Sequence, residues 1–127
     1  MNMQRKWKIA GSAAVGVDPR YMGIGPIDAI RKVLEQTGYE LSDLELFEIN
    51  EAFAAPSLAV ERELGLNPDI VNVNGGGISI GHPIGNTGCR IVVTLLYEME
   101  KRGLKRGLAS LCGGGGHGEA MIIERID

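Results

Sequence analysis

Apolar residues recur at helical spacing in three segments of the chain. Residues 26–37 repeat an apolar side chain every three or four positions, which predicts a helix that Gly38 ends. A second helix should end at Leu64, before Gly65, and its regular hydrogen-bonded part can begin at Pro56. The strongest pattern predicts a third helix over residues 87–102.

Short β-type runs separate these helices. The extended opening over residues 1–18 is followed by runs over 44–49, 71–74, 107–112 and 119–126. The alternation of strands and helices predicts a layered α/β domain with a mixed, mostly parallel, five-stranded sheet. The last two strands should form an antiparallel hairpin joined by the glycine-rich segment 113–118. We expect the whole chain, residues 1–127, to form one domain.

The third helix differs from an ordinary surface helix. Between Cys89 and Leu96 it is apolar on nearly every face, which indicates burial on all sides. Some other part of the structure must therefore cover it.

Composition and charge exclude several classes of protein. The net charge is -3 with both signs scattered, so the chain lacks the basic surface of a nucleic-acid-binding protein. The longest strongly apolar run, residues 91–96, is far shorter than the ~20 residues that span a bilayer. Two cysteines are too few for a disulfide framework and favour a reducing, cytoplasmic location.

Two candidate binding motifs are weak. Residues 113–118 match the glycine spacing of a dinucleotide-binding loop, but a strand rather than a helix should follow them. Cys112 and His117, and likewise His82 and Cys89, are spaced too widely for a zinc knuckle. We therefore expect no metal and no bound nucleotide cofactor.

Three polar residues stand at the ends of predicted elements. His82 lies between Gly81 and Pro83 just before the third helix, which restricts its direction and suits a proton carrier. Cys112 ends a strand beside four glycines, whose N–H groups could bind an oxyanion. Asn50 ends another strand and could cap the next helix. Each also has a purely structural interpretation, as a core residue or part of a tight turn.

These motifs together resemble the C-terminal signatures of the thiolases. The resemblance is carried by five blocks, in the family's order: Met22-Gly-Ile-Gly-Pro26, Asn50-Glu-Ala-Phe53, Asn72-Val-Asn-Gly-Gly76, Gly81-His-Pro-Ile-Gly85 and Cys112-x-Gly-Gly-Gly116. The closest resemblance is to thiolases of the acetyl-CoA acetyltransferase type, which condense two acyl-CoA molecules or cleave a 3-ketoacyl-CoA. The resemblance covers the family's C-terminal part only.

The resemblance implies a role for each matching residue. His82, with a water held by Asn50, would polarise a thioester oxygen, and Cys112 would move the proton on the α-carbon. The N–H of Gly114 would help to bind the acyl-enzyme oxygen. Met22 and Phe53 match positions lining the pantetheine tunnel. The coenzyme A thioester is the substrate, and no separate cofactor is implied.

The same resemblance implies partners. The nucleophilic cysteine lies in the family's N-terminal half, so we expect this chain to be inactive alone and to need that half or a complementary subunit. The third helix lies between two sheets in the family, which leaves one flank bare here and favours a homo-oligomer. To serve as a base, Cys112 would need its pKa lowered by a neighbour such as His82. Pro56 departs from the family's usual residue and could shift the turn that carries Phe53. The alternative is a non-catalytic binding or assembly module.

Overall fold

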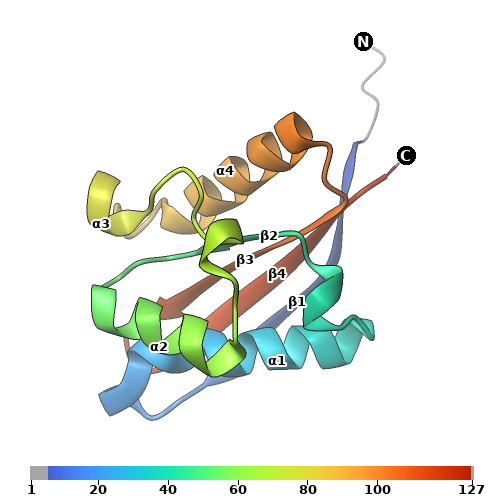
Figure 1. Ribbon diagram of the computed structural model, residues 1–127. Helices are drawn as coiled ribbons and strands as arrows, with labels where there is room; N and C mark the ends of the chain where they lie inside the picture. The colour runs from blue at the N-terminus through green and yellow to red at the C-terminus, as the bar shows by residue number, and fades with distance from the viewer. Residues whose placement is uncertain (1–5, 127) are drawn as a thin grey trace.

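Four strands form a mixed sheet at the centre of the protein, with helices on both faces (Figure 1). The structure is a computed structural model that describes residues 6–126. The strands are β1 (Trp7–Gly16), β2 (Leu46–Ile49), β3 (Arg106–Gly113) and β4 (His117–Arg125). They lie in the order β1-β4-β3-β2.

The prediction of a mostly parallel sheet is wrong. Of the four strands, only β2 and β3 pair in parallel with each other, whereas β4 pairs antiparallel with both β3 and β1. The sheet is mixed because the hairpin β3–β4 places β4 beside the opening strand of the chain. The antiparallel hairpin itself is confirmed.

The predicted fifth strand over residues 71–74 is a single bridge. Val71 pairs in parallel with Phe47, and the chain then turns away from the sheet. The turn occurs at Asn72, which adopts a left-handed backbone with φ of 46°. Asparagine tolerates that conformation better than most residues, so pairing ends after one residue.

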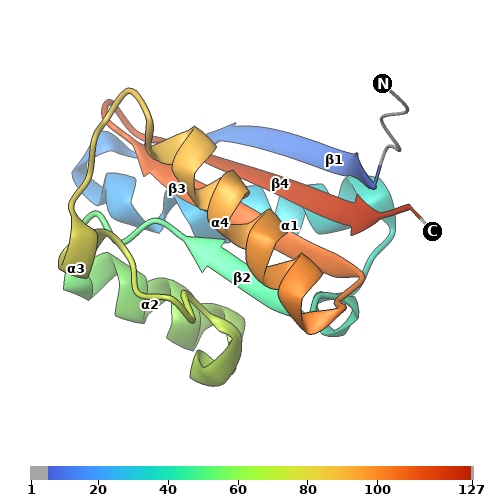
Figure 2. The ribbon, with the colours of Figure 1, turned by 90° about the horizontal axis from the view of Figure 1, so that it is seen from above.

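The helices form the two outer layers. Helices α1 (Gly25–Thr37) and α2 (Ala54–Leu64) lie on one face, and α4 (Thr87–Arg102) lies across the other (Figures 1 and 2). Short 3-10 turns, η1 (Pro19–Ile24), η2 (Leu41–Asp43) and η3 (Pro68–Ile70), and the one-turn helix α3 (Gly77–Ile80) connect them. The first and third predicted helices are confirmed.

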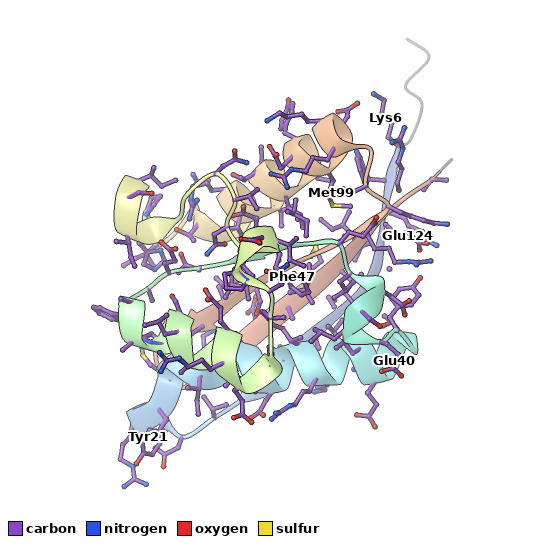
Figure 3. The ribbon with its side chains drawn as sticks, viewed as in Figure 1. Lys6, Tyr21, Glu40, Phe47, Met99 and Glu124 are labelled. Atoms are coloured by element: carbon purple, nitrogen blue, oxygen red, sulfur yellow. The ribbon has the colours of Figure 1, made fainter. Side chains whose placement is uncertain are left out.

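Alternation along β2 divides the core in two. Phe47 and Ile49 pack towards α1 and α2, whereas Leu46 packs with Leu95 and Met99 of α4. Figure 3 shows Phe47 and Met99 among side chains belonging to different layers. Both clusters are almost entirely aliphatic, and both are anchored on the same sheet.

Helix α2 begins two residues before Pro56. Proline is tolerated there because the first N–H groups of a helix have no partner within the helix. Phe53 is its N-cap residue, and no side chain caps it. The prediction that Asn50 caps this helix is therefore wrong, which leaves the Asn50 amide available for another purpose.

Helix α4 is covered on one side only. Ile91, Leu95 and Met99 are buried against the sheet, whereas Val93 and Tyr97 on the opposite side are exposed. The prediction that this helix is buried on all sides is therefore wrong for the described part of the chain, because one flank of the helix is exposed. Across the described chain, every helix is too short or too polar to reach across a bilayer.

Candidate functional site

The carboxyl ends of β2 and β3 bring two of the candidate residues together. These strands run parallel, so Asn50, which follows β2, lies beside the end of β3, and its N–H donates to the Ser110 carbonyl at 2.9 Å. Asn50 and Cys112 both line a small void that is too narrow to admit a water molecule. The void is enclosed by the residues Gly23, Pro26, Ile49, Pro56, Ser57 and Val60.

The side chain of Asn50 is buried without a partner. It is 5% exposed, and neither its amide oxygen nor its amide nitrogen makes a hydrogen bond. The strand end before it is held firmly: Asn72 accepts from the Ile49 N–H and donates to the Ile49 carbonyl, both at 2.8 Å. An unpaired buried amide costs stability, so a functional explanation is required.

Cys112 is a buried thiol near the end of β3. Burial raises its pKa above the usual value, and only a hydrogen bond to its own backbone opposes the shift. The expected lowering of its pKa by His82 is therefore not found in this chain. A thiol in this environment is protonated at neutral pH until a further group stabilises the thiolate.

A tight glycine turn follows Cys112. Gly115 and Gly116 have φ of 91° and 92°, a region open to glycine but not to ordinary residues. Gly114 at the start of the turn is exposed. Behind the turn, a Cβ on Gly118 would lie 2.1 Å from the Gly25 carbonyl oxygen, so the start of α1 packs directly on the β4 backbone.

His82 lies on the loop that leads from α3 into α4. Its Nδ1 is 2.7 Å from the Thr87 hydroxyl, and that hydroxyl donates to the Pro83 carbonyl at 3.1 Å. Threonine has one hydroxyl hydrogen, and in Thr87 it is donated to the Pro83 carbonyl. Nδ1 of His82 therefore carries a proton and donates it to the Thr87 hydroxyl oxygen. The Nε2 lone pair is then free to accept a proton from a substrate or a nucleophile.

The three candidates are not in mutual contact. Asn50 and Cys112 share the small void, whereas His82 does not line it. The His82 loop and the start of α4 do lie at the same end of the sheet as the β3–β4 turn (Figures 1 and 2). The three residues therefore stand around one end of the sheet.

The two predicted tunnel residues come from segments that touch. Met22 is partly buried in η1, and Phe53, before α2, is 68% exposed. Gly23 and Pro56 hold η1 and α2 together, because a Cβ on Gly23 would lie 2.7 Å from the Pro56 Cβ. Pro56 is thus a packing residue between these segments.

Sequence reasoning missed three residues beside the site. Thr87 orients His82, while Glu48 on β2 and Arg90 on α4 carry buried side-chain atoms without hydrogen-bond partners. Burial raises the pKa of Glu48 to about 7, although Arg90 opposes the shift. The sequence does contain a signal for Glu48: it is a carboxylate within the short apolar run of β2, where every residue is buried.

Comparison with known proteins identifies the family. Residues 3–125 match the family model described as "Thiolase, C-terminal domain". This chain belongs to the thiolase family. The acetyl-CoA acetyltransferase of Paracoccus denitrificans is 59% identical over 118 residues, which cover 93% of this chain and 30% of that protein.

Solved thiolase structures share the fold. The Bacillus anthracis acetyl-CoA acetyltransferase matches with a TM-score of 0.95 and 56% identity, covering 98% of this chain and 32% of the other. Human mitochondrial 3-ketoacyl-CoA thiolase in complex with CoA matches with a TM-score of 0.93 and 47% identity, covering 95% and 31%. The chain thus spans about a third of the length of these thiolases.

Proposed function

We propose that this chain supplies Asn50, His82 and Cys112 to a thiolase of the acetyl-CoA acetyltransferase type. The main support is the Asn50 amide, which is buried, unpaired and in the same void as the Cys112 thiol. A second support is the hydrogen bond from His82 to Thr87, which leaves Nε2 free. The substrate is a coenzyme A thioester, with no separate cofactor.

In this proposal Cys112 acts as the base. Its thiolate takes a proton from the α-carbon of an acetyl thioester, and the resulting carbanion attacks the carbonyl carbon of an acyl-enzyme. A carbon–carbon bond forms, the bond from the acyl group to the nucleophilic cysteine breaks, and that cysteine leaves as a thiolate. The reverse sequence, ending in transfer to coenzyme A, is thiolysis.

The other residues stabilise charge. His82 accepts the proton of the nucleophilic cysteine at Nε2. The protonated ring, with a water held by Asn50, then donates to the thioester oxygen as the carbanion forms, and the Gly114 N–H binds the acyl-enzyme oxygen. Removal of a proton from a carbon next to a thioester is difficult without such donors, because the charge moves onto oxygen. Met22 and Phe53 line the path of the pantetheine arm.

The remaining length of the relatives completes the site. The nucleophilic cysteine belongs to that part, so these 127 residues are inactive without it. Helix α4 and the strands beside it line an apolar groove of about 640 Å³. Its lining includes Ile9, Ala13, Cys89, Val92 and Met121. We propose that the N-terminal thiolase half packs against this groove. Chains that lack this half would self-associate through the same groove. We also propose that the protein acts in the cytoplasm.

Complementation tests this proposal. The chain is mixed with the polypeptide corresponding to the remaining N-terminal part of the Paracoccus relative, and thiolysis of acetoacetyl-CoA is followed. We expect activity only in the mixture, and a fall of about 10²–10⁴-fold for His82→Ala and Cys112→Ser. His117→Ala is the matched control for His82→Ala and should retain activity.

The same assay can reject the proposal. Full activity of the His82→Ala mixture would remove His82 from the mechanism. Tight association of the two polypeptides with no thiolysis or condensation under any condition would favour a non-catalytic assembly module instead.

A further inference from the structure

Unpaired buried polar atoms are concentrated in three side chains beside the proposed site. Within residues 6–126, the buried side-chain nitrogen and oxygen atoms without a hydrogen bond belong to Glu48, Asn50 and Arg90. All three guanidinium nitrogens of Arg90 are in this group, together with one carboxylate oxygen of Glu48. Buried polar groups are normally satisfied, so this concentration points to a specific role.

The placement of Glu48 connects it to Asn50. Side chains two positions apart along a strand lie on the same face, so Glu48 follows Leu46 towards the α4 side. Asn50 comes directly after the end of β2 at Ile49 and lines the void beside Val60 and Cys112. Glu48 is 1% exposed. Any force on the Glu48 carboxylate therefore acts on the strand that ends at Asn50.

The placement of Arg90 connects it to His82. Arg90 follows Thr87 by three residues, so the two side chains lie on the same face of α4, one turn apart. Thr87 is fully buried and holds the His82 ring. Any force on the Arg90 guanidinium therefore acts on the turn of α4 that orients His82.

We propose that Glu48 and Arg90 are positioning residues, whose opposite buried charges hold the start of α4 against β2 and set the spacing between Asn50 and His82. The inference rests on the proposed function of Asn50 and His82. Within the described residues the two side chains form no ion pair, so their attraction acts across a longer separation, through a medium less polarisable than water. Neither group makes a competing hydrogen bond through the atoms named above.

The protonation of Glu48 supports this arrangement. Desolvation raises its pKa to about 7, Arg90 lowers it, and the negative charges of Glu51 and Glu98 raise it further. Arg90 is thus the cation that favours the ionised carboxylate. Loss of Arg90 would leave Glu48 neutral and remove the attraction between the strand and the helix.

The test is the ring spectrum of His82 in the intact chain. Long-range ¹H–¹⁵N spectra, recorded at a pH where imidazole is neutral, report which ring nitrogen carries the proton. We expect one tautomer, protonated at Nδ1, in the parent chain and a mixture in Arg90→Met and Glu48→Gln. Arg90→Lys keeps the charge and should retain most of the parent signature.

A matched control lies at the other end of the same helix. Arg102 donates to the buried Glu98 at 2.6 Å. Arg102→Met should lower the thermal midpoint without changing the His82 spectrum. The double variant Glu48→Gln/Arg90→Met should recover stability, since neither charge is left alone, but not the tautomer.

Several outcomes would overturn the inference. An unchanged His82 spectrum in folded Arg90→Met and Glu48→Gln would do so, as would an equal change in Arg102→Met. If Arg90→Met does not fold, Glu48→Gln and Arg90→Lys decide. The ring spectrum needs no complementing polypeptide, so its result is independent of whether the complemented chain is active.

An activity measurement adds a second readout in the complemented protein. There, Arg90→Met should lower kcat by about 10²-fold with little change in KM, as expected when a catalytic group is misplaced. Parent-like kcat in an active Arg90→Met mixture would contradict the positioning role.

Discussion

The two ends of the sheet differ in whether their buried polar side chains have hydrogen-bond partners. At the end near the chain termini, Glu124 on β4 accepts hydrogen bonds from Tyr39 and Lys8, both at 2.9 Å, and pairs with Arg106 at 3.0 Å. Arg106 also lies 4.6 Å from the centre of the Tyr39 ring. Figure 3 shows Glu124 at this end, far from Tyr21 at the other.

At the opposite end, Glu48, Asn50 and Arg90 are buried without hydrogen-bond partners for the atoms named above. The hydrogen bond from Lys8 contributes most to holding the pKa of Glu124 at about 2, whereas desolvation raises that of Glu48 to about 7. Satisfied charges stabilise a fold, and unsatisfied ones cost stability and persist where function requires them. Under the proposed function, the end near the termini stabilises the fold and the opposite end carries the chemistry.

The strongest test of this division is Asn50→Leu. The substitution removes an unpaired buried amide and keeps its approximate volume, so the free energy of unfolding should not fall. Activity in the complemented protein should drop about 10²–10³-fold, as for loss of an oxyanion donor. Asn74→Leu is the contrast, because Asn74 donates to Glu98 at 3.0 Å and its loss should reduce stability instead. A stability loss for Asn50→Leu as large as that for Asn74→Leu would contradict the comparison.

A backbone contact at the site end provides the next largest effect. Gly118→Ala places a methyl group 2.1 Å from the Gly25 carbonyl oxygen, where the backbone cannot easily yield. We expect a loss of about 3 kcal/mol in unfolding free energy from overpacking, measured by urea denaturation. Gly16→Ala, with no atom within 4 Å of the new Cβ, is the control. Parent-like stability of Gly118→Ala would show that this end is loosely packed.

At the stabilising end, Glu124→Ala should act on the fold alone. It leaves Tyr39 and Arg106 without their acceptor, so we expect a loss of about 2 kcal/mol in urea denaturation and unchanged activity in the complemented protein. Glu119→Ala is the matched control on the same strand, because its carboxylate is 56% exposed and lies 3.9 Å from His117. A large loss of activity in Glu124→Ala would mean that the two ends are coupled.

The smallest expected effect is on the pH dependence of stability, which compares Glu124 and Glu98 directly with Glu48. Glu124 and Glu98 have pKa values of about 2, below the ordinary 4.5, so their stabilisation is present above pH 4.5 and is lost as the pH falls towards 2. Glu48 has a raised pKa, so the folded state binds more protons than the unfolded state between pH 4.5 and 7. Its contribution therefore weakens as the pH rises through that range.

Glu48→Gln should remove only the loss of stability between pH 4.5 and 7 that the raised pKa of Glu48 causes. Urea denaturation at pH 5 and pH 7.5 should show the parent losing more stability than Glu48→Gln on going to the higher pH. Equal changes in the two proteins would mean that Glu48 has an ordinary pKa. The loss of stability below pH 4.5 should be the same in both.

The sequence by itself determined the elements whose signals are local. Helical spacing of apolar residues and the glycines at 38, 65 and 103 located the ends of three helices, because each of these glycines adopts a left-handed backbone immediately after its helix. Motifs around His82, Asn50 and Cys112 indicated the family that the comparisons then showed.

Only the tertiary structure decided how distant segments pair and which polar groups are buried. Antiparallel pairing of β1 with β4, the single bridge at Val71 and the exposed flank of α4 depend on contacts between segments far apart in the chain. The same is true of the pKa of Glu48, because desolvation depends on what surrounds a carboxylate after folding and not on its neighbours in sequence.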